Sequence, residues 1–153
     1  MNSRRPVLDA ISKNIIELLQ QDGRMSFTDI SRTVGLSEAA VRQRVQRLVE
    51  SGVMQITAVT NPLELGFARQ ALVGVRVTGD TREVADLIAE FDEVDYVVLT
   101  AGSFDLLVEV LCVDDEALLS LINDRLRAVP GVLATETFVY LRLVKQSYTW
   151  GTR

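Results

Sequence analysis

Histidine is absent from the 153-residue sequence. It is the usual general base near neutral pH and the commonest metal ligand, so its absence excludes histidine-dependent catalytic triads and zinc sites. Only Lys13 and Lys145 could supply an amine, and neither lies in a recognisable site. We therefore expect no metal ion and no cofactor.

Cysteine and long apolar runs are equally scarce. Cys112 is the single cysteine, so it cannot form an intrachain disulfide, and its apolar neighbours indicate that it packs as a small hydrophobe. No segment reaches the roughly 20 apolar residues of a membrane span, and residues 1–10 lack the apolar core of a signal peptide. The sequence predicts a cytoplasmic protein with no membrane association.

Charge is distributed unevenly along the chain, whose net charge is −5. Residues 1–60 hold eight Lys and Arg against six Asp and Glu, a balance of +2. Residues 61–153 hold eight against fifteen, a balance of −7. This asymmetry is typical of a phosphate-facing domain joined to one that does not contact DNA.

The predicted N-terminal domain, residues 1–53, consists of three short helices. Asp9 is placed to cap the first, Ser26 the second and Ser37 the third, each before apolar residues at helical spacing. Gly35 ends the second helix and, with Leu36, leaves the tight turn of a helix-turn-helix. Three helices with this turn predict a winged-helix-like DNA-binding domain.

The third helix presents a polar face opposite its apolar positions Val41, Val45 and Leu48. Glutamine pairs with adenine edges, and arginine pairs with guanine or phosphate, so this face suits the major groove of a double-stranded, palindromic operator. A solvated helix face is the alternative, and the capped helix and glycine turn before it favour DNA binding. The predicted DNA-contacting residues are Ser37, Ala39, Arg42, Gln43, Arg44, Gln46 and Arg47.

The rest of the chain predicts a connecting strand and linker at residues 54–67 and a second domain at 68–153. Its elements follow the order βαββαβ, which is the ferredoxin-like arrangement and makes the fold class α+β. The expected strands are 68–77, 94–100, 104–113 and 133–144, and the expected helices contain Val84, Leu87, Ile88 and Phe91, then Leu119, Ile122, Leu126 and Val129.

Both faces of the last expected strand are apolar, although two helices cover only one face of such a sheet. Leu133, Val139, Leu141 and Leu143 alternate with Ala134, Phe138 and Tyr140. The uncovered face predicts an obligate homodimer. The aromatic tail, with Tyr148 and Trp150, is expected to pack on a neighbouring subunit or over an effector site.

In these features the sequence resembles the Lrp/AsnC family of leucine-responsive, or feast/famine, regulators. Ser12 and Ile56-Thr57 depart from the family pattern. The resemblance implies a C-terminal domain that dimerises, often assembles into octamers, and binds amino acids between subunits. Its carriers are Leu8-Asp9, Asp22-Gly23-Arg24, Val34-Gly35-Leu36-Ser37, Arg44-Val45, Arg47-Leu48, Gly52-Val53, Pro62, Leu65-Gly66, Gly102, Asp105, Pro130-Gly131-Val132, Thr135 and Thr137.

The resemblance also implies an effector site on the loop Thr100 to Asp105 and on the last strand. Asp105 can accept from an ammonium group, and two hydroxyls spaced two apart share a strand face. Alternatively, Gly102 only turns a hairpin, Asp105 caps it, and the threonines are ordinary strand residues. The implied effector-binding residues are Thr100, Gly102, Ser103, Phe104, Asp105, Thr135 and Thr137.

These features together predict a sequence-specific transcriptional regulator that responds to an amino acid or related metabolite. An amino-acid-sensing interaction module and an effector-independent architectural DNA-binding protein remain as alternatives. An enzyme is not expected, because the acidic clusters at residues 92–95 and 114–116 flank predicted helices and no base, metal motif or phosphate loop converges with them.

Overall fold

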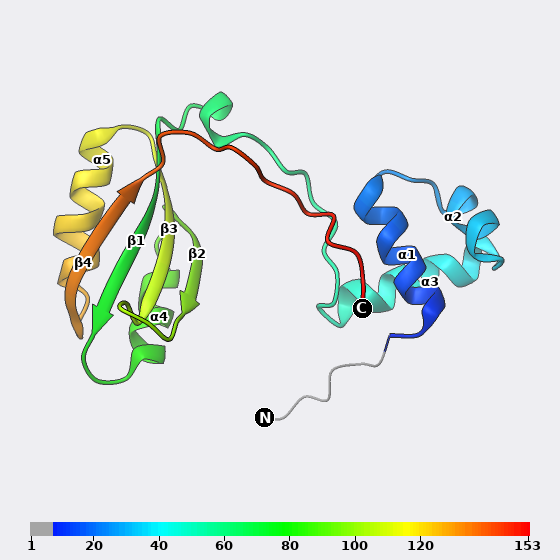
Figure 1. The fold of residues 1–153 in the computed structure, drawn as a ribbon, viewed down its shortest axis with the longest axis horizontal. Helices are drawn as coiled ribbons and strands as arrows, with labels where there is room; N and C mark the ends of the chain where they lie inside the picture. The colour runs from blue at the N-terminus through cyan, green and yellow to red at the C-terminus, as the bar shows by residue number, and fades with distance from the viewer. Residues whose placement is uncertain (1–7) are drawn as a thin grey trace. The chain divides into compact units, whose positions relative to one another are not determined.

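The computed structural model describes residues 8–153, which fall into two compact units (Figure 1). The helical unit contains the chain up to Ala58 together with Lys145–Arg153, and the sheet unit contains Val59–Val144. The last nine residues thus join the helical unit, whereas the sequence analysis assigned them to the second domain. Across residues 8–153, no helix combines the length and apolarity needed to cross a membrane.

Three helices form the helical unit: α1 (Ala10–Gln21), α2 (Phe27–Val34) and α3 (Glu38–Glu50). Each begins at the predicted cap, whose side chain accepts a hydrogen bond from a backbone N–H three residues later. The distances are 2.7 Å at Asp9, 3.1 Å at Ser26 and 3.2 Å at Ser37. These caps satisfy amides that a helix leaves unpaired at its start, so all three predicted helix starts are confirmed.

The turn between α2 and α3 depends on Gly35. Its φ of 71° lies in the left-handed region, where a β-carbon would be strained. The amides of Gly35 and Leu36 both donate to the carbonyl of Ser31, at 3.0 and 3.1 Å, and close the end of α2. Two residues later Ser37 caps α3, which gives the predicted helix-turn-helix.

The core of the helical unit lies where its three helices meet. Ile15 of α1, Ile30 of α2 and Val41 of α3 are fully buried, and Val45 and Leu48 extend the contact along α3. Burial of these side chains selects one face of α3 as the inner face. The opposite face is thereby left to solvent.

The short strand predicted after α3 is absent. Met54 packs against the helical core, and the segment then continues without regular structure to the 3₁₀ turn Pro62–Leu65. A strand forms only where its backbone groups find a neighbouring strand. No such pairing exists for residues 54–61 in the described part of the chain.

The sheet unit has the predicted order of elements. It comprises β1 (Arg69–Val77), α4 (Thr81–Ala89), β2 (Val94–Leu99), β3 (Leu106–Cys112), α5 (Asp115–Ser120) and β4 (Val132–Val139). The strands are antiparallel in the order β2-β3-β1-β4, which is the ferredoxin-like topology (Figure 1). The predicted fold class is confirmed.

Strand β4 ends at Val139 and does not continue to residue 144. The amide of Tyr140 makes the last pairing contact, a 2.9 Å hydrogen bond to the carbonyl of Gln70. The neighbouring strand β1 begins at Arg69, one residue before Gln70, so no strand backbone lies opposite the residues that follow Tyr140. The apolar alternation of the sequence continues beyond Val139, but β1 offers no further backbone with which these residues could pair.

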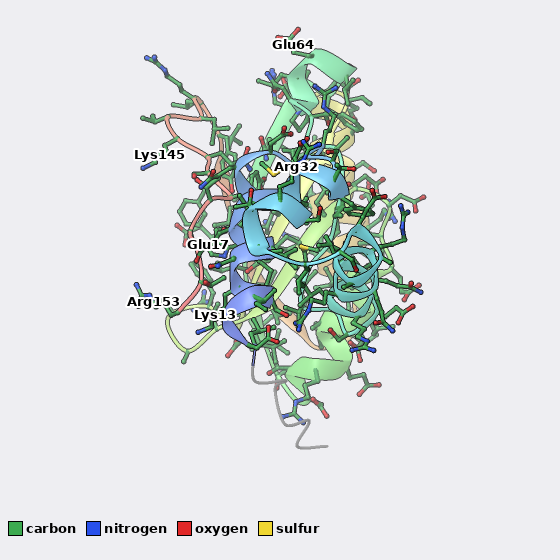
Figure 2. The ribbon with its side chains drawn as sticks, turned by 90° about the vertical axis from the view of Figure 1, so that its right-hand side faces the viewer. Lys13, Glu17, Arg32, Glu64, Lys145 and Arg153 are labelled. Atoms are coloured by element: carbon green, nitrogen blue, oxygen red, sulfur yellow. The ribbon has the colours of Figure 1, made fainter. Side chains whose placement is uncertain are left out.

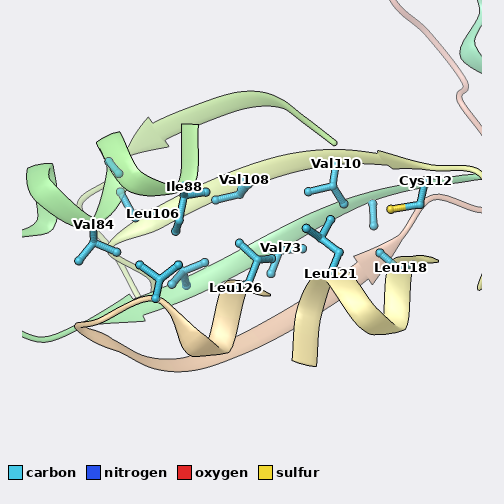
Figure 3. Packing of buried hydrophobic residues seen from close by; sticks show 14 residues of the cluster. Val73, Val84, Ile88, Leu106, Val108, Val110, Cys112, Leu118, Leu121 and Leu126 are labelled. Carbon is cyan, nitrogen blue, oxygen red and sulfur yellow. The ribbon is translucent and has the colours of Figure 1, made fainter. Parts of the chain in front are cut away.

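One face of the sheet packs against the helices and forms the second core (Figure 3). Val73 and Val108 are fully buried at its centre, beneath Ile88 of α4 and Leu121 and Leu126 from the segment of α5. The predicted helical positions are partly wrong here, because Leu87 and Leu119 are exposed. Fewer of the predicted helical side chains therefore contact the core than the sequence pattern indicated.

The helical segment after Asp114 is irregular, which explains the exposed Leu119. Helix α5 passes into a π turn at Leu121–Arg125 and then a 3₁₀ turn at Leu126–Ala128. A π turn inserts extra backbone, so the buried positions step by five residues from Leu121 to Leu126. A regular helix drawn through this segment puts the wrong residues on its inner face.

Candidate DNA interface and effector site

The outward face of α3 carries the predicted DNA-contacting residues. All of them are exposed except Arg44, which is half-buried. The side chains of Gln43 and Arg47 enter no hydrogen bond or ion pair among residues 8–153. An uncommitted glutamine and arginine on a protruding helix are suited to base-edge recognition in a major groove.

Two other polar side chains of α3 are held by neighbouring side chains, Gln46 within α3 and Arg42 by α3 and by Phe27 of α2. Arg42 lies 3.0 Å from the Glu38 carboxylate and 5.0 Å from the centre of the Phe27 ring, and Gln46 donates to Glu50 at 2.7 Å. Exposed contacts of this kind stabilise a helix weakly. Both side chains can therefore exchange them for a base or a phosphate at small cost.

Arg44, which the sequence predicts as a DNA contact, is paired within its own chain. Its guanidinium lies 2.7 Å from the Asp9 carboxylate and donates to the Ser12 hydroxyl at 3.1 Å, and the side chain is only 30% exposed. In this structure Arg44 ties α3 to the start of α1. The contact joins residues 35 positions apart, and helical spacing within α3 carries no signal of it.

Hydrogen bonds from the Ser12 amide and from Arg44 lower the pKa of Asp9 to about 2. The Ser12 amide is the largest cause, followed by the hydrogen bond from Arg44, because both favour the ionised carboxylate. The carboxylate therefore stays charged at any physiological pH and holds Arg44 in place. We interpret Arg44 first as an interhelical contact.

The second sheet face is not covered by helices, and we call it the open face. Directly paired residues of antiparallel strands point to the same side, so residues alternating with the buried Val73 and Val75 define it. Phe104, just before β3, lies over Gly74 on this face, and its ring meets that of Phe138 edge to face at 6.2 Å. The open face carries Gln70, Leu72, Gly74 and Arg76 on β1, Leu107, Glu109 and Leu111 on β3, and Ala134, Glu136 and Phe138 on β4.

A hollow of about 290 Å³ lies at the end of the open face. The structure brings three of the predicted effector residues to it and adds three that the sequence analysis missed, which lie on alternate positions of β1 and β4. Its lining is Arg76, Ser103, Phe104, Ala134, Thr135 and Glu136. Ala134 and Glu136 alternate with Phe138 along the last strand, so the sequence could have placed them on the same face. Nothing in the sequence indicated that Arg76 of β1 lies beside them.

Of the predicted effector residues, Thr135 lines the hollow, but its side chain lies with that of Thr137 on the other face of the sheet. Thr135 and Thr137 share one strand face, as predicted, but it is the helix-covered side, opposite Val75 and Val73. The Thr135 hydroxyl accepts a hydrogen bond from Arg127 at 3.0 Å. The two threonine side chains and the Phe104 ring are therefore on opposite faces of the sheet.

Internal hydrogen bonds hold the loop between β2 and β3. The Asp105 carboxylate accepts from the amide of Val77 at 2.8 Å, and the Thr100 hydroxyl donates to the carbonyl of Phe104 at 2.6 Å. The Thr100 amide also donates to the carbonyl of Asp105 at 2.9 Å. The Asp105 carboxylate is thus engaged with the end of β1, outside the hairpin that the alternative interpretation had it cap. Gly102 and Ser103 remain exposed, and a β-carbon at Gly102 would meet no atom within 4 Å.

The C-terminal tail contacts α1 of its own chain. The Gly151 amide donates to Gln20 at 3.0 Å, the Thr152 amide donates to Glu17 at 3.2 Å, and the Thr152 hydroxyl donates to the same carboxylate. Figure 2 shows the tail running beside Glu17. These contacts are made by Gly151 and Thr152, so the packing predicted for Tyr148 and Trp150 stays a prediction. The Trp150 ring itself remains 75% exposed.

Two family models match the chain in the order of its two units. The AsnC-type helix-turn-helix domain matches residues 8–49, and the Lrp/AsnC ligand binding domain matches residues 70–150. The chain belongs to the Lrp/AsnC family. It is thus a helix-turn-helix transcriptional regulator with a ligand-binding domain, which confirms the resemblance and the function predicted from the sequence.

Similar proteins span nearly the whole Lrp/AsnC chain. The regulator FL11 of Pyrococcus furiosus is 36% identical, with 94% of this chain and 95% of that protein covered. The leucine-responsive regulatory protein of Salmonella typhimurium is 34% identical, with 92% and 88% covered. The crystal structure of the leucine response regulatory protein LrpA of Mycobacterium tuberculosis is 27% identical, covers 91% and 96%, and superposes with a TM-score of 0.83.

Proposed function

We propose that this regulator binds a palindromic operator as a dimer and places the outward face of α3 in the major groove of each half-site. The observation that carries the proposal is the exposed, uncommitted pair Gln43 and Arg47 on a helix that Gly35 and Ser37 position within a helix-turn-helix. Arg42 and Gln46 supply further contacts by exchanging their helical partners. The proposal assigns no enzymatic reaction to the chain.

The dimer forms through the open face in this proposal. Phe138 is exposed there, as is Tyr96 of β2, which pairs with the open-face residue Glu109. Leu72, Leu107 and Leu111 lie on the same face half-buried, so the face is too apolar to remain in water. A two-fold dimer covers the face on both chains with one interface. Further assembly to octamers, which the resemblance implies, belongs to the same proposal.

The effector is an amino acid bound between subunits beside the loop Thr100 to Asp105 and the threonines of β4. The leucine-responsive name of the Salmonella relative supports this ligand class, and the exposure of Gly102 and Ser103 leaves the loop open to a ligand. Asp105 already accepts a hydrogen bond from the Val77 amide, and Thr135 accepts one from Arg127. A ligand that binds these two side chains therefore shares them with their internal partners. Coupling to DNA binding requires different affinities in two assembly states.

Titrations of operator DNA at several salt concentrations test the DNA-binding proposal. Changing Gln43 and Arg47 together to alanine should remove sequence preference while leaving salt-dependent, non-specific binding. Arg82→Ala, on α4 of the sheet unit, removes the same positive charge and is the matched control. Wild-type sequence preference in the double variant would refute the assignment of α3 as the reader.

Calorimetry against leucine and the other standard amino acids tests the effector proposal. Asp105→Asn keeps an oxygen for the Val77 amide but loses the charge, so it should fold and bind an ammonium group more weakly. Asp86→Asn, on α4, is the control for charge. If wild type bound none of the amino acids but still selected its operator, the effector-independent architectural alternative would replace the proposed sensor.

A further inference from the structure

Two opposite charges face the same hollow on the open face without meeting. Arg76 and Glu136 both line it, both are exposed, and neither enters an ion pair among residues 8–153. Strand pairing sets Arg76 opposite Ala134 and Gly74 opposite Glu136, so the two charges occupy diagonal positions on neighbouring strands. The open face thus carries one positive and one negative side chain that lie near each other and have no ion-pair partner within residues 8–153.

Their surroundings restrict what can cover them. Between β1, β3 and β4, the open face carries one other charged residue, Glu109, which accepts a 2.6 Å hydrogen bond from Gln70. The rest of the centre is apolar or aromatic, including Phe104 and Phe138. A surface that covers this face therefore meets two unsatisfied charges, and burying either without a partner is strongly unfavourable.

A second copy of the same chain satisfies both requirements at once. In a two-fold interface, if residue i contacts residue j of the other chain, then j also contacts i. One arginine and one glutamate on a single face are therefore self-complementary, and two equivalent ion pairs result. An unrelated partner would need an acid and a base at the same diagonal spacing.

We propose that Arg76 of each chain pairs with Glu136 of the other across the open face, and that this double pairing selects like chains as partners. The inference rests on the proposed dimer and deepens it, because the apolar residues give the association its strength and the two charges give it register and partner choice. The hollow at the end of each sheet is then the place where the pair forms.

Charge reversal tests the pairing with full-length chains. Arg76→Glu places two acids against each other at both contacts, and Glu136→Arg places two bases, so each homodimer should weaken by at least about tenfold. When the two variants are co-expressed with different tags, each contact regains one acid and one base. The double variant Arg76→Glu, Glu136→Arg should likewise regain the wild-type homodimer.

Native mass spectrometry of the co-expressed pair gives the decisive result. We expect an excess of heterodimer over the roughly one half that random pairing produces, because repulsion between like charges disfavours both homodimers. A random distribution would overturn the proposal. An ion pair within one chain would also give that distribution, since each variant chain would keep its own repulsion whatever its partner.

A control separates this proposal from the dimer itself. Phe138→Asp should disrupt the apolar face and shift the protein to monomer. If Phe138→Asp leaves the dimer intact, the open face is not the interface and both proposals fail. If it disrupts the dimer while the charge variants pair at random, only the Arg76–Glu136 pairing fails. If both charge variants keep wild-type homodimers but lose leucine binding in calorimetry, the hollow is a ligand site and the pairing is refuted.

Discussion

Replacing Gly74 by alanine tests how tightly the open face is packed. A β-carbon there would lie 2.7–2.8 Å from three carbons of the Phe104 ring, well inside the separation of about 3.5 Å at which carbons attract. The ring would have to move, and it already meets Phe138 edge to face. Gly74→Ala therefore perturbs one defined contact in the middle of β1.

The expected loss of unfolding free energy follows from two opposing effects. Overpacking costs about 1–3 kcal/mol, and the stiffer unfolded chain returns about 0.5–1 kcal/mol, which leaves a net loss of up to about 2.5 kcal/mol. Urea denaturation followed by circular dichroism measures it. Chain concentration must be held constant, because dissociation contributes to unfolding of a dimer.

The background variant Phe104→Ala makes this prediction decisive. The three atoms nearest to the new methyl group all belong to this ring, so its removal relieves the closest contacts and leaves the gain in the unfolded state. Gly74→Ala should then be neutral or stabilising by up to about 1 kcal/mol. An equal loss in both backgrounds would show that contact with Phe104 is not the cause.

Three further predictions concern other sites. Gly35→Ala should destabilise the helical unit by about 1–2 kcal/mol in thermal or urea unfolding, whereas Gly23→Ala, at ordinary φ, should stay near neutral. The pKa of Asp9, about 2, lies below its usual value near 4, so its contribution to folding stability is complete above pH 4 and is lost as the pH falls toward 2. Carboxyl NMR titration should give this low pKa in the wild type and a higher pKa in Arg44→Met. Burial raises the pKa of the Cys112 thiol, so a thiol reagent should modify it rapidly only in denaturant, and fast labelling of the native protein would contradict its burial.

The helix-turn-helix was predictable because its signals are local. Asp9, Ser26 and Ser37 each act on amides three residues away, and Gly35 acts through its own φ. Such short-range effects do not depend on the rest of the fold. The antiparallel sheet was also predictable, since its strands and helices alternate with distinct periods.

The failures have a common physical origin in contacts between distant segments. The end of β4 depends on where β1 begins, and the π turn after Ser120 changes which residues a helical pattern buries. The position of Arg44 depends on Asp9, 35 residues earlier. Likewise, the hollow needed the β1–β4 register to bring Arg76 near Glu136.

The contact of the tail with α1 has a consequence for synthesis of the chain. Residues 151 and 152 hydrogen-bond side chains of α1 that precede them by 131 and 135 positions. The three helices can fold as soon as they leave the ribosome, because their own core is local. Their last contacts cannot form until the entire sheet unit has been translated. A nascent chain interrupted within residues 59–144 therefore displays a helix-turn-helix that lacks these contacts.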